Sequence, residues 1–315
     1  MNVAEATETC ESVLEALEET IITDREFLET VLLGIVGRGH VLLEDVPGTG
    51  KTLTARSLAT ALGLSFSRIQ FTPDLLPADV TGTHIYDEQE GSFEFSKGPI
   101  FGNVVLADEI NRAAPKTQSA LLEAMAEEQV TVAGETYELP DPFFVIATQN
   151  PIEMEGTFEL PEAQVDRFLI KTAMGYPDLD GEVALLERRR ARTSKDPSVE
   201  TVLDTQEVRD LREVPETVEI DDDLLTYVSR VARETREHRD VEVGVSPRGT
   251  QRLFEASRAM AILAGRDYVI PEDVKRVAHP VLDHRIVLTA DARVEGTESS
   301  SVVDETLDSV PVPTV

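Results

Sequence analysis

A short segment in the first fifth of the chain combines glycines with a lysine and a threonine, and this combination can bind a chain of phosphates. Glycines let a loop curl so that its N–H groups and the next helix N-terminus face phosphate oxygens, Lys51 adds positive charge, and the Thr52 hydroxyl can coordinate Mg²⁺. The segment therefore predicts a triphosphate cradle. Its residues are Pro47, Gly48, Thr49, Gly50, Lys51, Thr52 and Leu53.

The alternative interpretation of this segment is a glycine-rich turn that only closes a strand-helix unit. The general phosphate-binding motif also has a glycine five residues before Gly50, where this chain has Asp45. The Lys-Thr pair lies between an apolar strand pattern and a helical pattern, which is the context that the motif requires. We therefore expect these residues to bind phosphates.

A second group of chemical interest is the acidic pair Asp108-Glu109, which follows four apolar residues, Val104 to Ala107. The pair would lie at the carboxyl end of a buried strand, where parallel-sheet proteins bind ligands. Asp108 could hold Mg²⁺ through water, and Glu109 could orient and polarise an attacking water. Such a strand end alone is often only a solvated loop, but beside a phosphate cradle it completes a site.

The elements that would position these residues can be predicted from the apolar pattern. Apolar runs predict strands, and apolar residues at helical spacing predict amphipathic helices. Strands that alternate with helices indicate an α/β fold with a parallel sheet covered by helices on both faces. The predicted strands are residues 40–44, 104–107 and 143–147, and the predicted helices are residues 3–21, 25–36, 51–62 and 118–128.

The pattern changes after Gly175-Tyr176-Pro177, where the periodicity becomes helical. We therefore expect a nucleotide-binding domain over residues 1–176 and a smaller all-helical domain over residues 177–290. Beyond it, residues 291–315 are rich in acidic, Ser, Thr and Val residues, and we expect disorder there. The predicted helices of the second domain are residues 180–192, 222–237, 247–264 and 271–283.

Several motifs in order resemble the AAA+ ATPases, and in particular their MoxR branch. Beyond the phosphate cradle, the similarity rests on residues 106–113, 118–125, 146–151, 160–168 and 245–248, and it covers roughly Val13 to Leu288. The resemblance implies a P-loop NTPase sheet followed by a helical lid domain, ATP and Mg²⁺ as cofactors, and ATP hydrolysis. Asp45 also occurs in this branch.

The resemblance assigns roles to several further residues. Asn150 would contact the γ-phosphate and the attacking water, although an Asn before a Pro is also a common turn former. Arg167 resembles the arginine finger that one subunit offers to its neighbour, and its alternative role is a local salt bridge with Asp166. Arg248 resembles the arginine that reaches the phosphates of its own subunit. Arg112 would face a subunit boundary.

Two further segments are similar to elements of the same branch. Residues 71–101 resemble the insertion in its second helix, and residues 129–139 resemble a β-hairpin. Both would point toward the central pore of a ring, and a passive flap is the alternative for the hairpin. The resemblance also implies a homo-oligomer, which we expect to be a hexamer, and a partner protein with a von Willebrand factor A domain.

The charge of the chain separates the remaining classes of function. Asp and Glu number 60 against 29 Lys and Arg, a net charge of −31, and we expect a halophilic protein whose repulsion is screened by concentrated salt. An acidic protein from an ordinary cell is the alternative. Residues 69–96 and 117–166 contain no Lys or Arg. Because nucleic-acid motors need basic pore elements, the pattern favours a protein-remodelling ATPase over a nucleic-acid motor.

A third class is a nucleotide-gated scaffold that binds ATP without turnover. This class is disfavoured because the set of residues expected to bind and hydrolyse ATP is complete: Lys51, Asp108, Glu109, Asn150 and Arg167. The only cysteine cannot form an internal disulfide, and the five histidines lack metal-ligand spacing. The longest apolar run is far too short to span a membrane. We expect a cytoplasmic protein without a membrane span.

Overall fold

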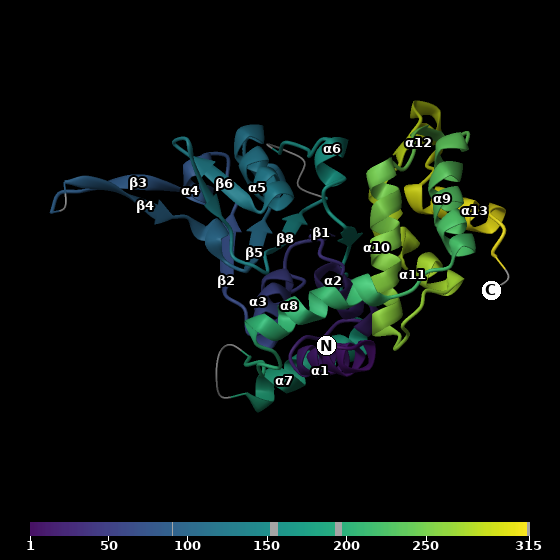
Figure 1. Ribbon diagram of the computed structural model, residues 1–315, viewed down its shortest axis with the longest axis horizontal. Coiled ribbons are helices and arrows are strands. Elements are labelled where there is room, and N and C mark those ends of the chain that lie inside the picture. The colour runs from purple at the N-terminus through teal and green to yellow at the C-terminus, as the bar shows by residue number, and fades with distance from the viewer. Residues whose placement is uncertain (90, 152–156, 193–196, 314–315) are drawn as a thin grey trace.

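The computed structural model describes residues 1–89, 91–151, 157–192 and 197–313. Its central element is a five-stranded parallel sheet with the strand order β2-β5-β8-β1-β9 (Figure 1). The strands are β1 (Val41–Glu44), β2 (Phe66–Gln70), β5 (Val104–Asp108), β8 (Phe144–Gln149) and β9 (Ile170–Thr172). Because all five strands are parallel, the loops that follow them meet at one edge of the sheet.

Alternate residues of the buried strands face two different helical layers. Leu43, Leu106 and Ile146 belong to one core with α1, α2 and α3, whereas Val105 and Val145 belong to the other core with α4 and α5. This arrangement confirms the predicted α/β sandwich. The helices are α1 (Val3–Glu18), α2 (Arg25–Val36), α3 (Lys51–Ala61), α4 (Pro77–Thr81) and α5 (Pro115–Glu127).

The insertion and the hairpin expected from the sequence form two antiparallel ribbons that contact each other. A long ribbon, β3 (Gly82–Asp87) with β4 (Ser92–Lys97), projects far from the sheet, and β6 (Gln129–Val132) pairs with β7 (Glu135–Glu138) (Figure 1). The Phe95 and Tyr137 rings stack with centroids 3.9 Å apart, and the His84 Nε2 lies 3.2 Å from the Tyr137 hydroxyl. The two ribbons therefore form one unit.

The C-terminal part of the chain divides between the two halves of the molecule. The helices α7 (Leu179–Ala191) and α8 (Thr205–Glu213) lie beneath the sheet domain, whereas α9 to α13 form the lid at the right of Figure 1. The Val202 and Leu203 N–H groups donate to the Ala61 carbonyl oxygen at the end of α3. The lid helices are α9 (Asp222–Glu237), α10 (Pro247–Leu263), α11 (Pro271–Leu282), α12 (Ala290–Glu295) and α13 (Ser299–Ser309).

The lid and the sheet domain share a continuous core. The helices α1 and α2 pack against α10, and the Thr7 hydroxyl donates to the Ile262 carbonyl oxygen over 2.8 Å. The lid also contains a short antiparallel pair, β10 (Val241–Val243) with β11 (Val287–Leu288), so the expectation of an all-helical lid is wrong in this detail.

The expected disorder of residues 291–315 is wrong for most of that segment. The helices α12 and α13 cover residues 290–295 and 299–309, and the last two residues of the chain lie outside the described part. Val302 and Val303 of α13 are buried among apolar lid residues. The acidic and Ser-rich composition suggested disorder, but a few apolar positions are enough to anchor a short amphipathic helix to an existing core.

Candidate active site

The phosphate cradle lies between the end of β1 and the start of α3. Gly48 and Gly50 have φ values of 91° and 108°, which glycine adopts without the strain that a side chain would bring. The loop lines a cavity of about 370 Å³ together with side chains from the ends of β5 and β8. The lining residues are Pro47, Gly48, Gly50, Lys51, Thr52, Arg68, Gln70, Asp108, Glu109, Thr148, Gln149 and Asn150.

The Lys51 side chain folds back onto the loop that precedes it. Its Nζ donates to the carbonyl oxygens of Asp45 and Val46, each over 2.8 Å. Burial lowers the pKa of the Lys51 ammonium, and the negative charges of Asp45, Asp108 and Glu109 oppose this shift. The ammonium is thus held by two neutral acceptors that phosphate oxygens can replace.

One hydroxyl contacts both residues of the acidic pair. Thr148 in β8 donates to the Asp108 Oδ1 over 2.7 Å and accepts the Glu109 N–H over 2.8 Å. Glu109 has a φ of 56°, an uncommon conformation for a side-chain-bearing residue, and such conformations occur at functional sites. The Glu109 Oε2 accepts from the Gln70 amide and from the Arg112 guanidinium over 2.8 and 3.2 Å.

Arg68 is a site residue that the sequence motifs did not identify. It lies in β2, next to β5, and its Nε and Nη2 donate to the Asp108 Oδ2 over 3.1 and 2.7 Å. The Asp108 carboxylate is thus held from both sides, by Arg68 and by Thr148. No strand was predicted at residues 66–70, and without the sheet order no signal connects position 68 with position 108.

Asp45 has a structural role that a glycine at this position could not fill. It is only 6% exposed, and its Oδ2 accepts the N–H groups of Met174 and Gly175 over 3.1 and 3.0 Å. Its Oδ1 accepts the Val46 N–H over 2.8 Å. A glycine could accept none of these bonds, so Asp45 joins the start of the cradle to the segment that leaves β9.

A more apolar cavity of about 420 Å³ adjoins the other side of the cradle. Ile22, Leu53, Met174 and Leu185 contribute apolar side chains to it, and Thr49 and Gly50 of the cradle also line it. Aromatic bases bind in pockets of this size and character, where a few polar groups set the orientation. Leu53 therefore lies on this side of the loop, apart from the acidic pair.

The arginines implied by the resemblance lie outside these two cavities. Arg167 donates from its Nη1 to the Leu122 carbonyl oxygen in α5, and Arg248 is exposed at the start of α10. The alternative role of Arg167 was a salt bridge with Asp166. In the structure the Asp166 carboxylate instead contacts Arg285 and Ser246. Asn150, in contrast, lines the phosphate cavity.

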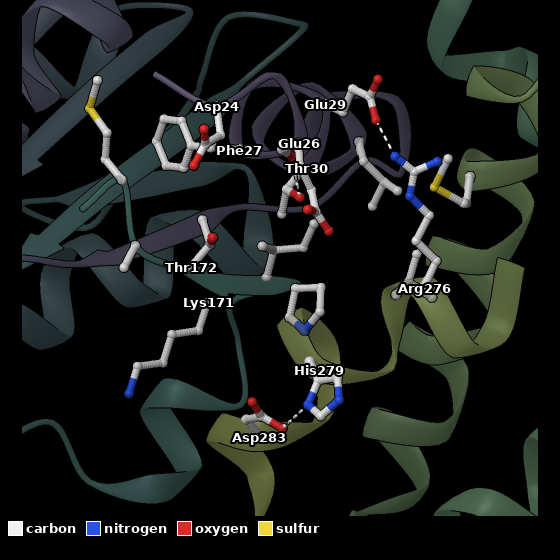
Figure 2. A pocket seen from close by; sticks show the side chains of 17 residues that line it. Asp24, Glu26, Phe27, Glu29, Thr30, Lys171, Thr172, Arg276, His279 and Asp283 are labelled. Atoms are coloured by element: carbon white, nitrogen blue, oxygen red, sulfur yellow. Dashed lines mark hydrogen bonds and ion pairs between the residues drawn. The ribbon is translucent and has the colours of Figure 1, made fainter. Parts of the chain in front are cut away.

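A further cavity of about 400 Å³ lies between α2, β9 and α11, and Figure 2 shows two pairs of interacting polar side chains in its lining. Arg276 of the lid binds Glu29, and the His279 Nδ1 lies 3.2 Å from the Asp283 carboxylate. The described residues contain no group of three or more His, Cys, Asp or Glu side chains that could hold a metal ion.

Comparisons with known proteins agree with this geometry. Residues 40–170 match the ATPase family associated with various cellular activities (AAA), and residues 233–306 match the AAA lid domain. The chain is 42% identical to Chaperone MoxR1 of Mycobacterium tuberculosis over 98% of its own length and 83% of that protein. It belongs to the MoxR family of AAA+ ATPases.

Two other proteins match over nearly the whole chain. Identity to the uncharacterized protein YeaC of Bacillus subtilis is 47%, over 95% of this chain and 93% of that protein. A solved structure of an ATPase candidate from Cytophaga hutchinsonii superposes with a TM-score of 0.92 at 40% identity, covering 99% of this chain and 97% of the other. Within the described residues of this MoxR chain, no helix combines the length and apolar character of a membrane span.

Proposed function

We propose that this protein is a Mg²⁺-dependent MoxR ATPase that uses ATP hydrolysis to remodel partner proteins or to assist their assembly, including metal insertion. The observation that carries the proposal is that a glycine-rich cradle and two hydrogen-bonded carboxylates line one cavity at the same edge of the sheet. Such an arrangement serves phosphoryl transfer, in which positioning and charge stabilisation supply most of the catalysis.

The donor atoms around the cradle fit Mg²⁺ bound to a triphosphate. The Thr52 hydroxyl and the Asp108 carboxylate line the same cavity, and hard oxygen ligands of this kind are those that Mg²⁺ prefers. The bound ion would neutralise charge on the outer phosphates. Lys51 and the loop N–H groups would bind the phosphate oxygens, and the adjoining apolar cavity would hold the base.

Glu109 is the proposed residue that activates water. In hydrolysis the water oxygen forms a bond to the γ-phosphorus, the bond between the γ-phosphorus and the bridging oxygen breaks, and the water proton passes to the Glu109 carboxylate. Gln70 and Arg112 hold that carboxylate, and Asn150 lines the same cavity. Asn150 would contact the γ-phosphate and orient the water.

The site is proposed to be completed between subunits. Arg167 lies outside its own phosphate cavity and belongs to the turn before β9, so it would serve the nucleotide of a neighbour in a hexameric ring. Arg248 at the start of α10 would reach the phosphates of its own subunit when the lid moves. The projecting β3-β4 ribbon and the β6-β7 ribbon would then face the pore.

A mixing experiment tests the shared site. Arg167→Ala should keep ATP binding through Lys51 and lose about 10³-fold or more in hydrolysis, because a finger stabilises charge that develops in the transition state. Lys51→Ala should lose ATP binding. In mixed rings, an intact Arg167 from the second variant can face an intact cradle of the first, so activity should return; no return, with mixed rings shown by native mass spectrometry, would contradict the trans role.

The partner is proposed to carry a von Willebrand factor A domain, as the family resemblance implies. A nucleic-acid motor is the competing function, and the lack of Lys and Arg in residues 69–96 and 117–166 disfavours it. ATPase assays with single-stranded DNA, RNA and a candidate partner separate the two. Stimulation by nucleic acid alone would contradict the remodelling proposal.

A further inference from the structure

Arg285 of the lid forms a dense set of contacts with the segment that carries Arg167. Its side chain is only 1% exposed, and its Nε donates to the Asp166 Oδ1 over 2.8 Å. Its Nη2 donates to the carbonyl oxygens of Asp166 and Phe168 over 3.2 and 2.6 Å, and its Nη1 donates to that of Leu169 over 3.3 Å. One lid side chain thus fixes the backbone on both sides of Arg167.

The same carboxylate contacts a second lid element. Ser246 is the N-cap residue of α10, and its hydroxyl lies 3.3 Å from the Asp166 Oδ2. Two residues after Ser246 stands Arg248. Gly249 in the first turn of α10 allows Arg285 to approach, because a Cβ there would lie 2.8 Å from the Arg285 Cδ. Asp166 therefore lies between the turn of Arg167 and the helix that begins near Arg248.

We propose that Asp166, Arg285 and Ser246 form a coupling cluster that positions Arg167 according to the position of the lid. The proposal rests on the proposed function, because it assigns Arg167 to the neighbouring subunit's nucleotide. Ser246 and Arg285 belong to the lid, at the start of α10 and in η4 (Asp283–Arg285). A movement of these elements would therefore displace the Asp166 carboxylate, which is adjacent to Arg167. The lid of one subunit would thereby control hydrolysis in the next.

The charges in the coupling cluster suit a permanent contact. Burial lowers the pKa of Arg285 to about 10, and the Asp166 carboxylate opposes this shift, so the guanidinium remains charged at neutral pH. Burial and the Arg285 charge lower the pKa of His284, which keeps the adjacent imidazole neutral. The ion pair is the connection between the lid and the finger turn, and Ser246 adds a neutral hydrogen bond.

The mixed rings described above can separate the two ends of the coupling cluster. The acceptor subunit carries Arg167→Ala and keeps its cradle, and the donor subunit carries Lys51→Ala and keeps its finger. We add Asp166→Asn to the donor alone or to the acceptor alone. Misplacement by about 1 Å can lower a rate about 10²-fold, so we expect hydrolysis to fall at least about tenfold with the substituted donor. The substituted acceptor should keep most of the recovered activity, with ATP affinity unchanged.

Asp166→Asn leaves the buried Arg285 charge without its partner and can therefore prevent folding. A second variant tests the coupling without removing this ion pair. Ser246→Ala in the donor removes the neutral contact and one helix cap, and Thr289→Ala is the matched control because Thr289 caps α12 without contacting Asp166. Ser246→Ala should lower recovery more than Thr289→Ala does. Equal effects of these two variants, or equal effects of Asp166→Asn in donor and acceptor, would overturn the coupling alone.

A different result would identify a failure of the proposed function itself. If the donor and acceptor without further substitutions form mixed rings and recover no activity, then Arg167 does not act in trans and the coupling falls with it. If that pair recovers activity and Asp166→Asn in the donor causes no loss of it, the trans role of Arg167 stands. Only the role of the coupling cluster is then refuted.

Discussion

At the scale of residues, hydrogen bonds hold both members of the acidic pair in place. Thr148 joins the backbone of Glu109 to the carboxylate of Asp108, and Arg68 holds the other oxygen of that carboxylate. Such preorganised contacts reduce the reorganisation that a reaction requires. Lys51 is different, since its partners are two backbone carbonyl oxygens of its own loop. It is the group expected to change partners when phosphate binds.

We predict that Glu109→Gln separates binding from turnover. The substitution keeps the size of the side chain and removes its ability to accept a proton, so ATP should bind as in the unsubstituted protein while hydrolysis falls at least about 10²-fold. Lys51→Ala should instead weaken binding itself. Calorimetric ATP titrations and phosphate-release assays measure the two properties, and an equal loss of both in Glu109→Gln would refute the assigned role.

We also predict that Asp45→Gly, which restores the general motif, destabilises this protein. The change removes the acceptor of the Met174 and Gly175 N–H groups, and hydrogen bonds to a charged group contribute about 1.5–3 kcal/mol each. The free energy of unfolding should fall by at least about 2 kcal/mol. Urea denaturation measures it, with Asp180→Asn, an exposed carboxylate in α7, as the control. Unchanged stability would show that the linkage is dispensable.

At the scale of elements, the lid includes one helix whose composition gives little intrinsic helical preference. The helix α13 is Ser-rich and acidic, yet it packs against α9 and α11 through buried valines. In a short helix of this kind, tertiary packing supplies most of the stability. The helix is therefore part of the lid fold, and the sheet domain is connected to that fold through α1, α2 and α10.

A pair of matched substitutions tests the packing of α13. Val303 is 0% exposed, whereas Val294 in α12 is 89% exposed. Val303→Asp should lower the free energy of unfolding by at least about 2 kcal/mol, because it buries a carboxylate without a partner. Val294→Asp should change it by less than about 0.5 kcal/mol. Chemical denaturation followed by circular dichroism measures both, and equal stability of the two variants would mean that α13 is not docked.

At the scale of the whole molecule, charge is the dominant property. A net charge of −31 on a chain with six lysines creates self-repulsion that destabilises a compact state at low ionic strength. Arg25 contacts the carboxylates of Glu11, Glu18 and Glu29 at the same time. These contacts offset only part of the excess, because the chain has about two acidic residues for each basic one.

We predict that stability and ATPase activity rise with salt up to the molar range. The Debye length falls from about 10 Å at 0.1 M to about 3 Å at 1 M salt, so the repulsion between exposed carboxylates is screened. Thermal melts across a KCl series measure the effect, and sucrose at equal osmolality serves as the uncharged control. A melting temperature that does not change with KCl would contradict the halophilic interpretation.

The sequence alone determined the elements with strong local signals. The helices at residues 25–36 and 222–237 and the cradle followed by a helix were predicted at or near their observed bounds, because periodic apolar residues and glycines act over short distances. The motifs and their order along the chain were also enough to predict the MoxR family, which the comparisons confirm. The roles assigned to Lys51, Glu109 and Arg167 stay predictions.

Tertiary structure alone decided which distant residues meet. Arg68 reaches Asp108, Asp45 reaches Gly175, and Arg285 reaches Asp166 only because the sheet order and lid docking bring separate segments together. The short strands β2 and β9 and the helix α13 gave weak local patterns, since their stability comes from partners far along the chain. Contacts of this kind depend on packing between elements, which residue spacing along a single element does not encode.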